Sequence, residues 1–342
     1  MANILLTGGA GYVGSVCCAR LLDLGHSVVV VDDLSAGHAE AVPSDATFYR
    51  LDIGNRSALS ELVSERHFDV VFHFAAKALI PTSVSNPGAF FDSNVASAIG
   101  MLETLRAAGI RKFVFSSSAA VYGSPSVVPI PENHATIPMN AYGETKLMLE
   151  RVLQWYAVAY NWSVIAFRYF NASGAAGELG EDHEPETHII PLLLQTALGQ
   201  REFFEIYGND YATPDGTCLR DYVHVLDIAE AHALALQNLN GPRMSAFNIG
   251  TGISYSVKEV CRAVEKFAGR TLPVRLGPRR PGDPAVLCAS PKNIVTELNW
   301  KTRHSNLTEI VQSAWAWMER HQRATIEVPK KLGPKGIRST VE

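Results

Sequence analysis

The sequence predicts an α/β fold in which a doubly wound parallel sheet is covered by helices on both faces. Three observations indicate this fold. Short, continuously apolar runs, which are typical of buried parallel strands, recur along the first half of the chain. Stretches with helical spacing separate most of these runs. A glycine-rich segment follows the first run, at the point where a strand would lead into a helix.

The composition is that of a globular protein large enough for such a sheet and a second, smaller lobe. The chain has 342 residues, of which 47% are hydrophobic and 19% charged. The net charge of -4 does not favour a nucleic-acid or acidic-membrane partner. No run reaches the roughly 18 apolar residues of a membrane span, and the start, MANILLTGG, lacks the features of a signal peptide.

The cysteines give a further expectation about the cellular compartment. The chain has five, which are scattered and show no metal-ligand spacing: Cys17, Cys18, Cys218, Cys261 and Cys288. We expect a cytoplasmic protein with reduced, buried thiols and no bound metal.

Six apolar runs are expected to form the strands of the sheet. In order they are ANILLTGG, SVVVVDD, ATFYRLDI, FDVVFHFAA, RKFVFSSS and WSVIAFRYFN. A helix is predicted from Tyr12 to Leu24, with Gly25 as its stop signal. The alternation of strands and helices favours right-handed crossovers within one parallel sheet.

The pattern changes after Asn171. Residues 172–187 are rich in Gly, Ala and acidic residues and predict a loop, whereas HIIPLLLQTALGQ predicts a short helix. We expect residues 1–171, with later segments at about 220–250, to form the first lobe. Residues 172–325 would form mainly a smaller C-terminal α/β lobe, and residues 326–342 a flexible tail.

The glycine-rich segment TGGAGYVGS predicts a dinucleotide-binding, Rossmann-type loop. Gly8, Gly11 and Gly14 have the spacing that permits a tight turn, close approach of a pyrophosphate, and close packing of helix on strand. Tyr12 and Val13 lie in the first turn of the following helix, whose free N–H groups and dipole attract phosphate.

Asp32 ends the second predicted strand, where a carboxylate can accept hydrogen bonds from the adenosine ribose. Its charge would repel a 2′-phosphate, so the sequence favours NAD over NADP. Asp52 and Ile53 are placed to hold the adenine. The other expected cofactor contacts are Asp33, Leu34, Ser35, Phe74, Ala75, Ala76, Lys77, Asn94, Tyr142, Lys146, Tyr169 and Phe170.

Tyr142, Lys146 and Ser118 form the candidate catalytic group. Tyr142 and Lys146 are four residues apart, so a helix would place both side chains on one face. A nearby ammonium lowers the pKa of a phenol and makes it a candidate general base. Ser118, at the end of the fifth predicted strand, could hydrogen-bond the same substrate oxygen.

These motifs together resemble the extended short-chain dehydrogenase/reductase superfamily and, within it, the UDP-glucose 4-epimerase family. The resemblance covers roughly residues 3–320. It rests on the ordered segments GGAGYVGS, HFAA, SSSAAVYG, AYGETKLMLE, RYFNASGA, GNDYATPDGTCLRDYVHV and RRPGD.

The resemblance implies reversible epimerisation at C4 of a UDP-hexose, UDP-galactose to UDP-glucose, through a 4-keto sugar. Tyr142 would take the proton of the 4-hydroxyl, Lys146 would lower the pKa of Tyr142, and Ser118 would hold the sugar oxygen. A tightly bound NAD would accept the hydride and return it to the other face. Relatives that eliminate water or decarboxylate carry acidic residues beside the strand-five Ser or Thr, where this chain has Ala119 and Ala120.

The resemblance also implies the substrate contacts. Arg220, Arg280 and Asn171 match diphosphate contacts, Asp283 a uridine-ribose contact, and Tyr207 the uracil pocket. His188 and Ile189 lie beside the uridine diphosphate, with His188 where many members have Asn. Leu287 borders the 2-substituent of the sugar, and Lys77 is one position from the family's lysine, where this chain has Ala78.

Several alternatives stay open at this stage. The substrate could be another UDP-sugar: an N-acetylhexosamine, a pentose or a uronate. The chain could also be a net NAD-dependent oxidoreductase that releases NADH, or a non-catalytic NAD-sensing or scaffold protein. Proteins of the last kind typically lose the Tyr or the Lys, and both are present here. The resemblance further implies a homodimer formed through the helix that carries Tyr142.

Overall fold

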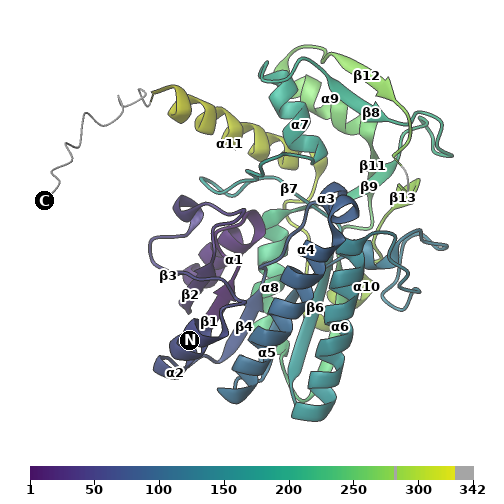
Figure 1. Ribbon diagram of the computed structural model, residues 1–342. Coiled ribbons are helices and arrows are strands. Elements are labelled where there is room, and N and C mark those ends of the chain that lie inside the picture. Colours follow the sequence, from purple (N-terminus) through teal and green to yellow (C-terminus); the bar gives the residue numbers. More distant parts are fainter. Residues whose placement is uncertain (281–282, 328–342) are drawn as a thin grey trace, which may run out of the picture.

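A large parallel sheet forms the centre of the first lobe, as predicted. The computed structural model describes residues 1–280 and 283–327 (Figure 1). Within these residues, seven parallel strands lie in the order β10-β6-β5-β4-β1-β2-β3. Their bounds are β1 (Asn3–Thr7), β2 (Ser27–Asp32), β3 (Thr47–Arg50), β4 (Val70–His73), β5 (Lys112–Ser118), β6 (Ser163–Tyr169) and β10 (Arg243–Ile249).

Helices cover both faces of this sheet. One face packs against α1 (Tyr12–Asp23), α8 (Val225–Asn238) and α10 (Lys292–Leu298), and the other against α2 (Arg56–Glu65), α5 (Ala98–Ala107) and α6 (Ala141–Tyr160). Along β1, Ile4 and Leu6 pack with the first group of helices and Leu5 with the second, because successive side chains of a strand point to opposite faces. Burial on both faces explains why the strands are continuously apolar.

The predicted first helix is confirmed. It begins at Tyr12 and ends at Asp23, and Gly25 beyond its end takes φ +79, a left-handed conformation that glycine adopts without strain.

The seventh strand comes from a later part of the chain than the other six. β10 pairs with β6 from Arg243↔Ser163 to Ile249↔Tyr169, and α8 packs on α1. Both belong to the segment 220–250 that we expected beside the first lobe. β9 (Leu219–His224), at the start of that segment, belongs instead to a separate small sheet.

The small lobe is built from short strands and three helices. β9 pairs with β7 (Asn171–Ser173), β11 (Ser254–Ser256) and β13 (Val286–Leu287), and β8 (Phe204–Tyr207) pairs with β12 (Val274–Gly277). α7 (Ile189–Ala197), α9 (Val257–Ala268) and α11 (Leu307–Glu327) share an apolar core. The predicted short helix is therefore confirmed as α7, and β7 occupies the start of the predicted loop.

Short helical segments complete the described chain. They are α3 (Ile80–Ser85), α4 (Pro87–Phe91), a π-helical turn (Asp92–Ser97) and two 3₁₀ turns (Ala39–Ala41 and Ala119–Tyr122). The predicted tail from residue 326 begins within the last turn of α11 and otherwise lies outside the described residues.

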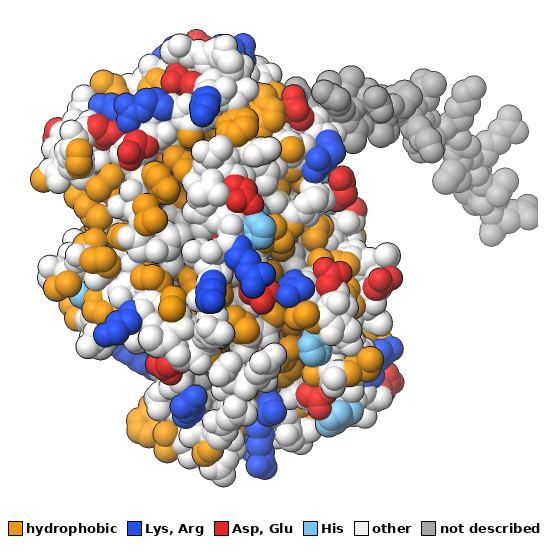
Figure 2. All heavy atoms as spheres, turned by 180° about the vertical axis from the view of Figure 1, so that it is seen from behind, with side chains coloured by type: hydrophobic (Ala, Val, Ile, Leu, Met, Phe, Trp, Pro, Cys, Tyr) orange, Lys and Arg blue, Asp and Glu red, His pale blue; other side chains and the backbone are white. Residues whose placement is uncertain are grey.

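Other sequence-based expectations can be compared with the structure. All five cysteines are buried free thiols, as predicted. In the part of the chain that the structure describes, no helix combines the length and apolarity that a membrane crossing needs. On the face that Figure 2 shows, basic and acidic side chains are interspersed.

Candidate active site

The glycine loop joins β1 to α1 at the carboxyl edge of the sheet, where the strand order reverses between β1 and β4. Gly8 takes φ +77, and a Cβ there would lie 2.3 Å from the backbone nitrogen of Ala75. A Cβ on Gly14 would lie 2.1 Å from the carbonyl oxygen of Gly8. The fold itself therefore requires these two glycines. A Cβ on Gly11 would meet only that same oxygen, at 3.5 Å, so space is open beside Gly11.

The start of α1 offers unsatisfied amide groups beside this space. Gly11 is the N-cap and provides no side-chain hydrogen bond, so the first-turn N–H groups are left for an external acceptor. A small pocket of about 70 Å³ opens beside Ala10, Gly11 and Tyr12. The Tyr12 hydroxyl donates to the carbonyl of Gly174, 2.6 Å away, and ties the helix to the loop after β7.

Asp32 is held rigidly at the end of β2. Its carboxylate accepts hydrogen bonds from the N–H groups of Ala10 (3.0 Å) and Leu34 (2.9 Å). Burial raises the pKa of Asp32, and these two N–H groups offset part of that rise. Asp33 closes the same turn by accepting from the Ser35 N–H at 2.8 Å. Each Asp32 oxygen has further acceptor capacity for a ribose hydroxyl.

Other predicted cofactor contacts lie at the ends of neighbouring strands. Asp52 accepts from the N–H of Gly54 at 2.8 Å, and Ile53 is buried. The Phe74 ring lies 4.9 Å from the ring of His232, which also meets the Tyr169 hydroxyl at 2.7 Å. The end of β4 and the end of β6 therefore share one buried histidine.

Asn94 fastens the segment after β4 to α6. Its Oδ1 accepts from the Lys77 N–H (2.8 Å), and its Nδ2 donates to the Lys77 carbonyl (3.0 Å) and the Thr145 hydroxyl (3.1 Å). Asn94 lies in the π-helical turn, a local distortion often found at functional sites. The sequence grouped Asn94 with the cofactor contacts, and these hydrogen bonds place it beside Lys77, another expected cofactor contact, and Thr145.

Ser118, Tyr142 and Lys146 come together where β5 ends and α6 begins. Asn140 caps α6 by accepting from the Gly143 N–H at 2.8 Å. Tyr142 hydrogen-bonds the Ser118 side chain. The Nζ of Lys146 lies 5.7 Å from the centre of the Tyr142 ring and donates to the Ser116 carbonyl at 2.7 Å.

Burial dominates the protonation of this group. Burial raises the pKa of Tyr142, and the hydrogen bond with Ser118 lowers it by less. Burial also lowers the pKa of Lys146 to about 7, although the negative charge of Glu150 acts in the opposite direction and raises it. We expected Lys146 to lower the pKa of Tyr142. In the protein alone burial outweighs any such effect, since Lys146 is only partly charged at neutral pH and is directed to a carbonyl.

A buried ion pair between Glu150 and Arg168 places a negative charge near Lys146. The sequence analysis did not predict this pair. Glu150 accepts two hydrogen bonds from Arg168, at 3.0 Å from Nε and 2.6 Å from Nη2, and a third from the Ser117 hydroxyl at 2.6 Å. Both charged side chains are buried. The available signal was spacing, because Glu150 follows Lys146 by four residues on the same helix face.

The predicted diphosphate and uridine contacts meet in the small lobe. Arg220, on β9, pairs with Asp283 at 3.1 Å and donates to the Pro284 carbonyl at 2.9 Å. The guanidinium of Arg280 stacks over the Tyr207 ring, 4.0 Å from its centre.

The remaining predicted substrate contacts connect the two lobes. Asn171 donates to the Asp221 carbonyl at 2.8 Å, and His188 and Ile189 stand at the start of α7. Leu287 is the register partner of Arg220, and it packs on a buried cluster of Ala119, Val121, Tyr122, Ile130, Leu147, Phe170 and Ala289. Leu287 therefore links the small lobe to the segment that follows Ser118.

Comparisons with known proteins agree with this geometry. Residues 4–250 match the model of the NAD dependent epimerase/dehydratase family. A UDP-glucose 4-epimerase of Lacticaseibacillus casei is 46% identical over 322 residues, which cover 93% of this chain and 97% of that protein. The chain belongs to the UDP-glucose 4-epimerase family.

Solved structures of this family share the whole fold. The UDP-glucose 4-epimerase of Brucella ovis in complex with NAD superposes with a TM-score of 0.89 at 42% identity, covering 92% of this chain and 98% of that one. The Stenotrophomonas maltophila enzyme, with bound NAD and formylated UDP-arabinopyranose, gives 0.90 at 39% identity, covering 95% and 100%.

NAD, the cofactor of this family, fits the residues present. The open space beside Gly11, the uncapped start of α1 and the fixed Asp32 carboxylate provide for a pyrophosphate and an adenosine ribose.

Proposed function

We propose that this chain interconverts UDP-galactose and UDP-glucose by inverting C4 of the hexose, with Tyr142, Lys146 and Ser118 as the catalytic residues. One observation carries the proposal: these three side chains meet where β5 ends and α6 begins, and Ala119 and Ala120 stand beside Ser118. Methyl groups cannot transfer protons, so the site supports interconversion of alcohol and ketone without an extra acid or base.

Tyr142 takes the proton of the sugar 4-hydroxyl and later returns it, while Ser118 donates to the same sugar oxygen. Lys146 lies beside the Tyr142 ring and stabilises the phenolate in its charged form. When bound, NAD supplies the hydride acceptor and a positively charged ring, which favours the phenolate further.

The cofactor is held by the loop Gly8–Gly14, the turn Asp32–Ser35, Asp52 and Ile53, and the segment Phe74–Lys77. Tyr169 and Phe170 lie at the end of β6, beside Ser118 at the end of β5. The substrate diphosphate is held by Arg220, Arg280 and Asn171, the uridine by Tyr207 and Asp283, and the sugar is bordered by Leu287. His188 and Ile189 contact the diphosphate from the start of α7.

The proposal extends to assembly and compartment. We infer a homodimer formed through α5 and α6, because Ile99, Trp155, Val158 and Tyr160 on these two helices are exposed apolar side chains. The five free thiols favour the reducing cytoplasm.

The decisive test is turnover without added cofactor. Purified protein is incubated with UDP-galactose alone, and UDP-glucose is followed by a coupled assay. We expect product from the wild type, and a rate at least about 10²-fold lower from Tyr142→Phe, because the general base is lost. Val286→Ala, a change of the same modest size on β13 of the small lobe, serves as a control.

Each alternative gives a different result. NADH that accumulates in proportion to product indicates a net oxidoreductase. If no product forms even with NAD added, the assigned hexose is wrong, and UDP-pentoses and UDP-uronates are tested as substrates. A Tyr142→Phe variant that keeps most of its activity contradicts the assigned base.

A further inference from the structure

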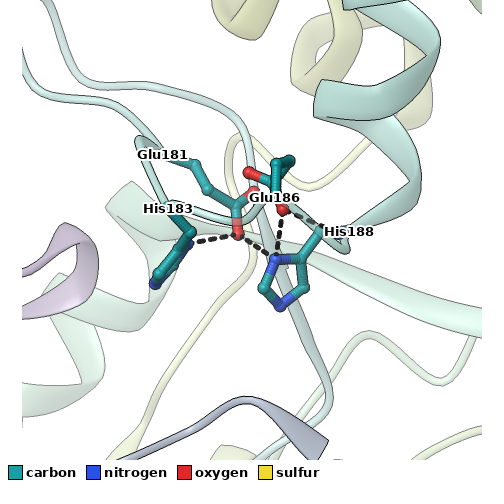
Figure 3. A group of neighbouring side chains, drawn as sticks. All are labelled: Glu181, His183, Glu186 and His188. Atoms are coloured by element: carbon teal, nitrogen blue, oxygen red, sulfur yellow. Dashed lines mark hydrogen bonds and ion pairs between the residues drawn. The ribbon is translucent and has the colours of Figure 1, made fainter. Parts of the chain in front are cut away.

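The loop between β7 and α7 brings two carboxylates and two imidazoles to one point (Figure 3). Glu181, His183, Glu186 and His188 each direct one ligand atom inward, and these atoms all lie within 4.8 Å of one another. The two glutamate side chains are only 8% and 6% exposed. Two buried carboxylates at such short range repel each other unless a cation lies between them.

The contacts within the cluster all converge on the same few atoms. The Nδ1 of His188 lies 2.8 Å from Oε1 of Glu181 and 2.8 Å from Oε1 of Glu186. The Nδ1 of His183 lies 3.4 Å from the same Glu181 oxygen, is buried, and has no hydrogen-bond partner. This imidazole nitrogen contacts the carboxylate only as an ion pair and points into the cluster, where it can ligate a metal ion (Figure 3).

We propose that these four side chains bind one Zn²⁺ ion. Imidazole nitrogen and carboxylate oxygen are both zinc ligands, at about 2.0–2.2 Å, and four of them complete a tetrahedral site. Ligand atoms around such an ion stand roughly 3.4 Å apart, so only small side-chain adjustments separate the observed distances from coordination. Imidazole ligands argue against Ca²⁺ and Mg²⁺, which take oxygen.

The charges balance in this arrangement. With both histidines neutral, the charges of the two buried carboxylates and of Zn²⁺ sum to zero. Without metal, the Nδ1 of His188 lies between the two carboxylates, 2.8 Å from an oxygen of each. A zinc ion would lie between the same two carboxylates and ligate both imidazoles.

The site is structural, because four protein ligands leave no position for a substrate. It lies in the loop between Asn171, on β7, and Ile189, on α7. The same loop is fastened to the glycine-loop side through Asp182, whose carbonyl meets His38 at 3.0 Å, and to α11 through the Glu178 carbonyl, which accepts from Trp317 at 3.0 Å. A metal here fixes the orientation of His188 and of the start of α7.

The proposal differs from the expectation of no metal. That expectation rested on the absence of Cys/His spacing, whereas these ligands are spaced Glu-x-His-x-x-Glu-x-His over residues 181–188. Only the folded loop shows that the four point to one centre.

The test is metal binding by the NAD-containing protein, after dialysis against a chelator. Titration calorimetry with Zn²⁺ is expected to give one site per chain. His183→Ala is expected to weaken binding at least about tenfold, and Glu181→Gln to do the same. His67→Ala, an exposed histidine outside the loop, is the matched control and should bind as the wild type does.

Two further measurements distinguish a built site from surface adsorption. Co²⁺ in place of Zn²⁺ should give the visible absorption of tetrahedral coordination, and Zn²⁺ should raise the unfolding temperature of the wild type but not of His183→Ala. Absence of binding at one equivalent means that the cluster is only a histidine–carboxylate ion pair, and overturns the proposal. So does binding that both variants leave unchanged. None of these measurements depends on the sugar that the enzyme converts.

Discussion

Two glycines of the same loop have different physical roles. Gly8 is confined by the fold, since its positive φ and the nearby Ala75 backbone exclude any side chain. Gly11 has an ordinary φ of -85 and open space beside it. Packing therefore does not require glycine at position 11, and we propose that the bound cofactor does.

Alanine at these two positions should separate folding from cofactor binding. Gly8→Ala is expected to destabilise the protein by at least about 1–3 kcal/mol, through backbone strain alone. Gly11→Ala should retain much less NAD on purification, but once NAD has been removed from both proteins it should unfold at nearly the same urea concentration as the wild type. Urea unfolding and NAD released on denaturation measure the two effects. Full NAD content in Gly11→Ala would show that the open space does not receive the pyrophosphate.

At the scale of single residues, a substitution of Leu287 tests whether this side chain borders the sugar pocket. Its side chain packs beside the segment after Ser118, so Leu287→Ala should enlarge the space there. We expect the rate on UDP-N-acetylgalactosamine, relative to UDP-galactose, to rise at least about tenfold. Val286→Ala, the preceding residue of β13, points to the opposite face and should leave this ratio unchanged. An unchanged ratio in Leu287→Ala removes Leu287 from the pocket.

At the scale of elements, one buried histidine joins three of them. His224 ends β9 and caps α8, because its Nδ1 accepts from the Leu226 N–H at 3.1 Å. Its Nε2 lies 2.9 Å from the Ser313 hydroxyl on α11. The cap requires a neutral ring, since a protonated Nδ1 cannot accept.

This histidine should make the fold sensitive to acid. Burial lowers the pKa of His224 to about 4; His304 adds to this, while Asp227 and Glu309 oppose it. The unfolded chain, with an ordinary pKa near 6.5, binds the proton more readily, so stability falls as pH drops from about 6.5 towards 4.

His224→Asn keeps a cap acceptor but cannot titrate. Between pH 8 and pH 5 the wild type should lose roughly 1–2 kcal/mol more of its free energy of unfolding than this variant does. Urea unfolding at the two pH values measures the difference, with the exposed His67→Asn as control. Parallel losses in wild type and His224→Asn would assign the acid sensitivity to another group.

At the scale of the whole molecule, α5 and α6 lie on the outside of the first lobe (Figure 1), and both helices carry exposed apolar side chains. Trp155 is 71% exposed and Val158 is 64% exposed. A buried Trp is typically among the residues on which an interface depends most.

Trp155→Glu should therefore produce monomers. We expect the dimer dissociation constant to rise at least about 30-fold, which corresponds to 2 kcal/mol for an interface residue of this kind. Sedimentation equilibrium measures this. Val295→Glu, on α10 across the sheet, is the matched control and should remain a dimer. A Trp155→Glu variant that dimerises like the wild type places the interface elsewhere.

The sequence by itself determined the six strands, the first helix and the glycine loop, because each depends on local spacing and on backbone preferences. It also brought together Ser118, Tyr142 and Lys146, since a strand end and one helix face hold them. Tertiary structure decided what spacing does not encode. β10 joins the sheet only by pairing with β6, and Glu150 reaches Arg168 only across the core. The protonation of Tyr142 and Lys146 depends on burial, and burial is a property of the packed molecule.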